Sequence, residues 1–212
     1  MKTLLSIASL LLWLATSTAS AQVQDADLLK AMQHYRGIYT ARAMVTRTQH
    51  NVLLADDEVT QGVLYVKAPD KVCMTFHAGE DRMLMNGKLF AISSGGKTNA
   101  AVGRIQTQFE GFFRVFMHVF LGKEPTLDIS SIADVQIQKQ AGRCTITVTP
   151  VEETTAKGKK KASLFASAVF TVDLKTGEFR SFRMNEKGDN YTLYTFTEFT
   201  LGGTISDSQF EL

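Results

Sequence analysis

One stretch near the middle of the chain, residues 106–121, limits the possible folds more than any other. It is the most Phe-dense segment of the sequence. At about 100° per residue its apolar side chains cover an arc of about 200°, whereas a surface helix needs little more than about 100°. A helix of this kind should pack on two sides. Two interpretations remain open: a buried core helix, or a helix that covers an apolar cavity and is partly exposed when the cavity opens.

The opposite side of this predicted helix carries its polar residues. Glu110, Arg114 and His118 recur at i, i+4 spacing, with Glu before Arg, which is the favoured order for a helical pair. Gly122 is the expected C-cap. We therefore expect these three side chains to form the polar side of the helix.

Most of the remaining chain alternates between apolar and polar residues, the period-2 pattern of β-strands. A short helix is predicted before the strands, over residues 25–35, and a glycine-rich connection over residues 93–103. Asn86-Gly87 is a strong hairpin signal, because a type I′ turn needs positive φ at both positions. The expected strands cover residues 39–46, 59–67, 72–77, 82–85, 88–93, 135–140, 143–149, 164–174, 178–185 and 191–201, with a further short strand around Phe210.

These strands predict a mainly β fold with a single antiparallel sheet. A sheet of about ten or eleven strands should curl rather than stay flat, and a sheet that curls onto itself makes a complete or incomplete barrel. The interior of such a barrel is too wide for small side chains to fill. The phenylalanine-rich helix is the only long helix available to fill or cover it, which favours the covering interpretation.

The first 21 residues are typical of a secretory signal peptide. Lys2 supplies the positive start, residues 4–14 are apolar, and Ala19-Ser20-Ala21 is an A-x-A cleavage site. Cleavage after Ala21 leaves residues 22–212 as one domain, long enough for a sizeable core. No Cys follows the cut, so nothing indicates a lipid anchor. We expect a periplasmic protein.

Net charge argues against binding to nucleic acid or an anionic membrane, and the length of the apolar segments argues against a transmembrane helix. Without Lys2 the chain has 23 − 1 = 22 basic and 21 acidic residues, which gives no electrostatic case for binding nucleic acid or an anionic membrane. No segment reaches the roughly 20 apolar residues of a transmembrane helix.

No catalytic or metal-binding constellation stands out. The histidines are scattered without zinc-site spacing, and Cys73 and His77 would lie about 13 Å apart along a strand, too far for a nucleophile and its base. Gly95-Gly96-Lys97-Thr98 lacks the first glycine of a phosphate-binding loop. We therefore expect neither enzymatic activity nor a cofactor. Cys73 and Cys144 are expected to be buried thiols, with a disulfide between them left open.

Two segments resemble the LolA family of periplasmic outer-membrane lipoprotein carriers. They are Gly62-Val63-Leu64-Tyr65-Val66-Lys67-Ala68-Pro69-Asp70-Lys71-Val72 and Met85-Asn86-Gly87-Lys88-Leu89-Phe90. The resemblance implies an unclosed antiparallel barrel around an apolar cavity, with helices as a lid. It implies a monomer that takes acylated lipoproteins or lipids from an inner-membrane ABC-type transporter and delivers them to an outer-membrane acceptor. A lipid-sensing or regulatory module of the envelope on the same fold is the alternative.

The resemblance also indicates which residues would contact cargo. Asp in place of Phe113 or Phe116 should, on this interpretation, impair loading more than folding. Two positions depart from the family: Ala68 stands where its arginine before the proline holds the lid, and Met74 stands where it has a cavity tryptophan. The implied cavity and lid residues are Leu64, Val66, Val72, Met74, Phe76, Leu84, Phe109, Phe112, Phe113, Phe116, Met117 and Phe120.

Overall fold

The computed structural model describes residues 26–87, 89–100, 104–121, 132–151 and 165–211, with only the backbone described for 104, 105 and 119–121. The expected signal peptide and the side chain of Phe120 lie outside this part of the chain. The helices are α1 (Ala26–Ala31), α2 (Arg104–Leu121) and the 3-10 helices η1 (Met32–Tyr35), η2 (His77–Gly79) and η3 (Asp207–Phe210).

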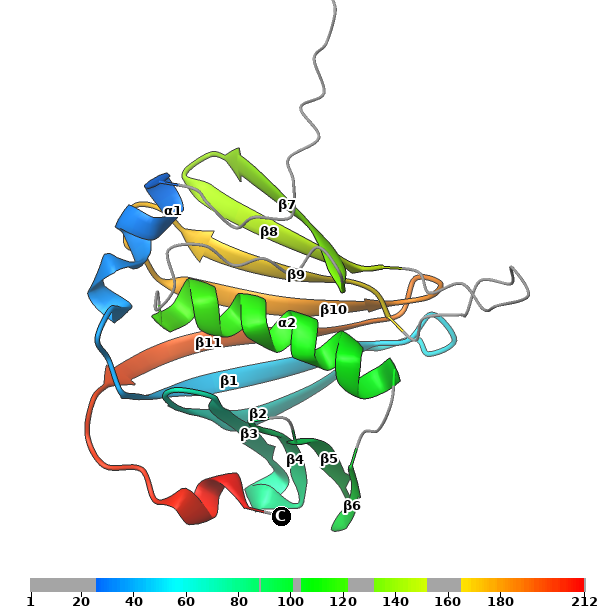
Figure 1. Cartoon of the computed structure of the whole chain (residues 1–212). Coiled ribbons are helices and arrows are strands. Elements are labelled where there is room, and N and C mark those ends of the chain that lie inside the picture. The colour runs from blue at the N-terminus through cyan, green and yellow to red at the C-terminus, as the bar shows by residue number, and fades with distance from the viewer. Residues whose placement is uncertain (1–25, 88, 101–103, 122–131, 152–164, 212) are drawn as a thin grey trace, which may run out of the picture.

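Eleven strands form one antiparallel sheet in the order β6-β5-β4-β3-β2-β1-β11-β10-β9-β8-β7 (Figure 1). The first and last strands of the chain pair at its centre, and β6 and β7 are its edges. The predicted fold class, a single unclosed antiparallel sheet, is confirmed. The strands are β1 (Thr40–His50), β2 (Glu58–Lys67), β3 (Lys71–Phe76), β4 (Asp81–Asn86), β5 (Leu89–Ser94), β6 (Lys97–Ala100), β7 (Ala133–Gln140), β8 (Arg143–Pro150), β9 (Phe165–Asp173), β10 (Phe179–Glu186) and β11 (Tyr191–Leu201).

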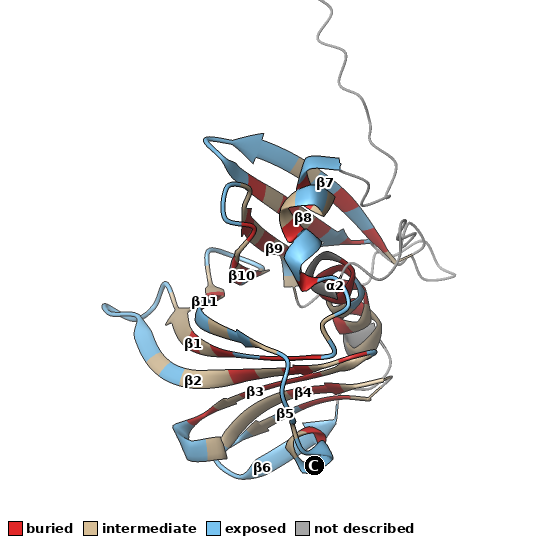
Figure 2. Ribbon diagram, turned by 90° about the vertical axis from the view of Figure 1, so that its left-hand side faces the viewer, coloured by how far each residue is buried: buried red, intermediate tan, exposed pale blue. Residues whose placement is uncertain are grey.

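The sheet is curled, and α2 occupies its concave side (Figure 2). A bulge helps to bend its centre: the β1–β11 register shifts between Arg42 and Met44, and Glu198 has a φ of 53°. Helix α2 follows β6 and precedes β7, so the chain crosses from one edge of the sheet to the other by way of this helix (Figure 1). The helix therefore lies over the opening that the unclosed sheet leaves.

Three local expectations were wrong. The glycine-rich connection contains β6, a strand whose residues are all exposed. The segment around Phe210 is the 3-10 helix η3 instead of a strand. His118, expected on the polar side of α2, is buried at 4% exposure, because α2 also contacts η1 and is covered on more than one side.

Gly62 allows β2 and β3 to pack closely beneath an aromatic ring. A Cβ at this position would lie 2.2 Å from the Thr75 carbonyl oxygen and 2.4 Å from the Phe76 ring. Both the backbone and the ring would have to shift. We expect Gly62→Ala to cost about 1–3 kcal/mol and to lower Tm by about 5 °C, measured by circular dichroism.

Gly111→Ala on α2 is the matched control. The added Cβ would meet Ile132 at 3.5 Å, an ordinary contact, and alanine is the better helix former by about 1 kcal/mol. Its Tm should stay level or rise. Equal losses in the two variants would contradict this interpretation.

Candidate functional site: an apolar cavity under α2

An apolar cavity lies between α2 and the concave face of the sheet. Its volume is about 50 Å³. Inward-facing side chains from both halves of the sheet and from α2 meet there, and each of the lining residues is aromatic, aliphatic or Met. The lining residues are Leu64, Val72, Met74, Met83, Met85, Phe90, Phe109, Phe112, Phe113, Phe116, Phe170, Phe182 and Phe196.

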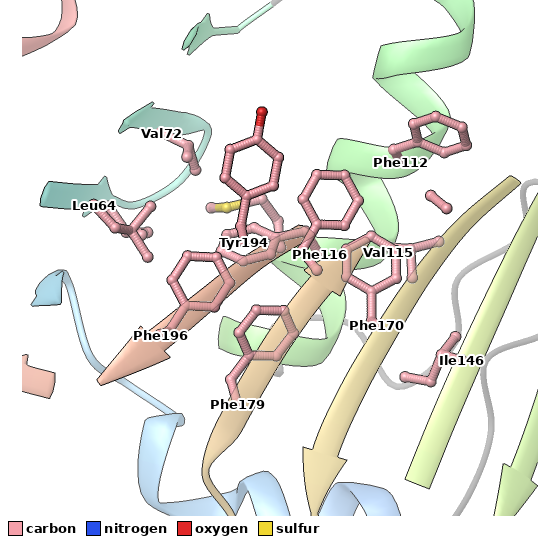
Figure 3. Close-up of a cluster of buried hydrophobic side chains, with 14 of the residues drawn as sticks. Leu64, Val72, Phe112, Val115, Phe116, Ile146, Phe170, Phe179, Tyr194 and Phe196 are labelled. Atoms are coloured by element: carbon pink, nitrogen blue, oxygen red, sulfur yellow. The ribbon is translucent and has the colours of Figure 1, made fainter. Parts of the chain in front are cut away.

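Phenylalanine rings connect α2 to both halves of the sheet. Phe109 of α2 stacks on Phe90 of β5, with ring centroids 3.7 Å apart. Phe116 points toward Phe170 and Phe179 on the other half, at 6.5 and 5.2 Å (Figure 3). Each such ring pair contributes about 0.5–1.5 kcal/mol beyond its area burial. Aromatic packing thus holds the helix against the sheet.

The cavity in this closed arrangement is too small for a lipid chain. An engineered apolar cavity of about 150 Å³ takes up benzene, and the cavity here is about 50 Å³. A long acyl chain therefore requires the phenylalanine side chains, α2 or both to move. The lining suits such movement, because Met side chains repack easily and aromatic contacts have no directional hydrogen bonds to break.

Seven of the predicted site residues line this cavity. Val66, Phe76 and Met117 belong to the same buried core without lining it. The side chain of Phe120 is outside the described part. The seven lining residues are Leu64, Val72, Met74, Phe109, Phe112, Phe113 and Phe116.

Leu84 is on the other face of the sheet, so its predicted place in the cavity was wrong. It packs with Cys73, Ala91 and Phe210 in a separate outer cluster. Residues 83–85 are all apolar, so the alternation could not tell which of them points inward. The structure turns Met83 and Met85 inward, and the C-terminal segment covers Leu84.

Polar contacts hold that C-terminal segment against β2–β4. Asp207 pairs with Lys67 at 3.0 Å and with Lys71 at 2.7 Å. Arg82 Nη2 donates to the carbonyl oxygen of Gln209 (2.7 Å), and Asn86 Nδ2 donates to that of Phe210 (3.0 Å). They keep Phe210 over Cys73, Leu84 and Ala91, the apolar part of the outer face of β3–β5.

The prediction missed six lining residues, and three of them lie on β9, β10 and β11, outside the family-like segments. Their signal was present as alternation: Phe182 and Met184, or Tyr194 and Phe196, recur at every second position. What the alternation could not give was which face of each strand turns inward. The missed residues are Met83, Met85, Phe90, Phe170, Phe182 and Phe196.

A polar mouth adjoins the apolar cavity at one end of the barrel. This hollow of about 460 Å³ shares Met83 and Phe109 with the cavity. Its other lining residues mix charged and polar side chains with aromatic and aliphatic ones. They are Arg47, Gln49, Glu58, Phe76, Asp81, Arg82, Ile92, Ser93, Ser94, Phe165, Met184, Glu186, Thr192 and Tyr194.

Arg47 is the central charge of this mouth. It continues the inward-facing row of β1, and its guanidinium lies 4.5 Å from the Phe76 ring centroid. Its Nη2 is 3.1 Å from Asp81 Oδ2 and 3.9 Å from Glu58 Oε1. Burial raises the pKa of the neighbouring Tyr194 to about 12, although Arg47 acts to lower it. Tyr194 is therefore a neutral phenol at every physiological pH.

The Arg47–Asp81 pair makes stability depend on pH. The Gly95 N–H donates a hydrogen bond to the Asp81 carboxylate. This hydrogen bond and the nearby Arg47 hold the pKa of Asp81 below its usual range, although partial burial acts to raise it. This contribution is present above the unfolded pKa of about 3.9 and is lost as pH falls through the lower folded pKa. We expect Asp81→Asn to cost about 1 kcal/mol at neutral pH and almost nothing in strong acid, measured by urea unfolding. An equal cost at both pH values would contradict this.

The other candidate reactive groups do not form a site. Cys73 and Cys144 are both buried and are not joined in a disulfide; Cys73 belongs to the outer cluster and Cys144 to the inner core. Burial raises the pKa of the Cys73 thiol, although Arg82 opposes this, so the thiolate form is disfavoured. Among the described residues there is no group of metal-ligating side chains, and no described helix is long and apolar enough to cross a membrane.

The two positions that depart from the LolA pattern lie in the core. Ala68 is 2% exposed and Met74 is 4% exposed, and Met74 lines the cavity. A small apolar side chain at position 68 has no donor to offer a lid. Ring contacts pack α2 against β5, β9 and β10.

No protein-family model matches the sequence, and no curated protein does either. Solved structures similar in fold include a DUF1329 family protein from Desulfovibrio piger, at 12% identity and a TM-score of 0.45 over 87% of this chain and 95% of that one. A putative outer membrane lipoprotein-sorting protein domain from Vibrio parahaemolyticus is 8% identical, with a TM-score of 0.47 over 87% and 94%. A LolA superfamily protein from Nitrosomonas europaea is 7% identical, with a TM-score of 0.42 over 90% and 98%. The single unclosed antiparallel sheet with one long covering helix is the architecture that the sequence resemblance predicts.

Proposed function

We propose that this protein is a non-enzymatic periplasmic carrier that binds the acyl chains of lipoproteins or other lipids. The observation that supports this most is the cavity lined by Phe, Met and aliphatic side chains between a curled sheet and one covering helix. It would be loaded at the inner membrane by an ABC-type transporter and unloaded to an outer-membrane acceptor. Residues 1–21 would direct export and be removed.

Burial of hydrocarbon supplies the driving force for binding. An acyl chain gains about 0.8 kcal/mol for each CH₂ that leaves water, so a chain in the cavity offsets the loss of the aromatic contacts it displaces. For release, the aromatic contacts that re-form when the helix closes must offset the loss of the buried acyl chain. Walls of Phe and Met, which repack without breaking hydrogen bonds, allow both steps.

The polar mouth gives an amphiphile a place for its other end. The chain would occupy the apolar cavity, and the headgroup or lipoprotein backbone would lie near Arg47 and Asp81, where the hollow of about 460 Å³ opens. Cargo with one apolar and one polar end fits an apolar cavity that opens into a polar mouth. A wholly apolar ligand would leave the mouth unused.

Lipid extraction from the exported protein tests the proposed function. The protein is purified from periplasm without detergent, and bound lipids are identified by mass spectrometry. We expect acylated lipids or lipoproteins at near-stoichiometric amounts, and their transfer from donor to acceptor vesicles. If neither purification nor incubation with donor membranes ever loads acylated cargo, the carrier function is wrong. Binding without transfer would favour a regulatory module instead.

A further inference from the structure

The tip of the β1–β2 hairpin exposes three consecutive aliphatic side chains. Val52 is 53% exposed, Leu53 88% and Leu54 62%. Single exposed apolar residues are common on protein surfaces, but an adjacent group at a protruding tip indicates an interaction site. The hairpin tip, residues 52–54, has no packing role that would account for these side chains.

The hairpin tip is an ordered turn whose backbone donors are satisfied. Val52 N–H donates to Asn190 Oδ1 at 3.0 Å. Leu53 N–H donates to Asn51 Oδ1 at 3.0 Å, and Leu54 N–H donates to the Asn51 carbonyl oxygen at 2.9 Å. All three apolar residues could therefore leave water without leaving a backbone N–H unpaired, which is the main barrier to placing non-helical backbone in an apolar environment.

Side chains at the base of the hairpin brace the tip. The His50 ring stacks on Tyr191 with centroids 4.8 Å apart, and His50 Nδ1 lies 2.7 Å from Asp57 Oδ1. These contacts join both arms of the β1–β2 hairpin to β11. The aliphatic side chains are thus presented on a supported turn, which limits the entropy lost when they bind.

The hairpin tip extends beyond the rim of the polar mouth. Gln49 and Glu58, which lie on the two arms of this hairpin, both line the mouth. The β10–β11 turn, which holds the tip through Asn190, lies at the same end of the sheet (Figure 1). A surface touched by the tip would face the opening through which cargo would pass.

We propose that Val52, Leu53 and Leu54 insert into the interfacial region of a lipid bilayer. A convex tip of three aliphatic side chains with paired backbone donors suits a bilayer better than a protein partner, which would need a far larger matched surface. Asp56, Asp57 and Glu58 follow the tip after Ala55. These carboxylates limit the depth of insertion and remove any preference for anionic lipid.

Membrane contact at this tip goes beyond cargo binding, which the proposed function places in the cavity. Docking through the tip would set the polar mouth against the membrane surface. An acyl chain could then pass between bilayer and cavity with little exposure to water. The tip and the cavity are separate surfaces, so each can be disabled alone.

Flotation with vesicles of zwitterionic phosphatidylcholine tests this proposal. The double variant Leu53→Ser/Leu54→Ser changes only exposed side chains and should remain folded. We expect it to bind vesicles at least about tenfold more weakly than the unaltered protein, since each aliphatic side chain contributes substantially when it leaves water. Tyr39→Ser, which removes a 59% exposed apolar side chain just before the other end of β1, is the matched control and should bind normally.

Several outcomes would overturn the proposal. They are failure of the unaltered protein to float, equal binding by the double variant, or clearly tighter binding to vesicles that contain anionic lipid. Retention only on membranes that contain proteins, lost in the double variant, would show a protein-docking surface instead. Loading with a fluorescent fatty acid in solution should be unchanged in the double variant. If the unaltered protein floats but never takes up the fatty acid, the carrier function fails while the membrane contact stands.

Discussion

Phe116→Asp is expected to unfold the protein, whereas Phe113→Asp leaves it folded but unable to load cargo. Phe116 is 7% exposed and contacts Phe170 and Phe179. Losing its ring costs about 3–5 kcal/mol, and a carboxylate there adds a desolvation penalty. Together these approach the whole stability of an ordinary domain, about 5–15 kcal/mol.

Phe113 differs because it is only partly buried while still lining the cavity. A carboxylate at this position can reach water, so the fold tolerates it, but the charge faces the site where an acyl chain would lie. The sequence alone suggested the same outcome for both positions, and the packing of α2 now separates them.

Thermal unfolding followed by circular dichroism, together with binding of a fluorescent fatty acid, checks both expectations. Phe113→Leu is the matched control, since it keeps an apolar side chain and should bind nearly as well as the unaltered protein. Normal fatty-acid binding by Phe113→Asp would show that Phe113 is not part of the binding site. A cooperative transition near the original Tm for Phe116→Asp would show that α2 is not packed as described.

The fold class could be predicted from the sequence because the spacing of apolar residues, which distinguishes a strand from a helix, can be read within a single segment. Alternation identified ten of the eleven strands, and the broad apolar arc of residues 106–121 identified α2. The strand that it missed, β6, has only exposed residues and so lacks any apolar alternation. Pairing with β5 forms this strand, and pairing is invisible in a single segment.

The candidate site was only partly predictable, because a face of a strand becomes inward only in the assembled sheet. Leu84 and Met83 are both apolar, so the sequence alone does not show which of them faces the cavity. Leu84 faces outward, where the C-terminal segment covers it. His118 was assigned to solvent because helical periodicity cannot show which sides of α2 the rest of the chain covers. The sequence indicated no site between the expected strands 39–46 and 59–67, although the hairpin tip in that segment contains exposed leucines.

A tryptophan introduced at Met74 is expected to lose most of its fluorescence when a brominated fatty acid binds. The only native tryptophan is Trp13, in the expected signal peptide, so a protein that begins at Gln22 has no other. Met74 lines the cavity, and bromine quenches an indole only at close range.

Tyr65→Trp is the matched control for Met74→Trp. Tyr65 lies on the neighbouring strand β2 but packs against the outer cluster on the opposite face of the sheet. Both variants should bind the fatty acid, and the same acid without bromine should quench neither.

Comparing the two tryptophans tests directly whether the cavity between α2 and the sheet holds the acyl chain. We predict strong quenching of Met74→Trp and little or none of Tyr65→Trp at saturating brominated fatty acid. Equal quenching of both, or an unquenched Met74→Trp in a protein that has bound the chain, would contradict a cargo site in this cavity.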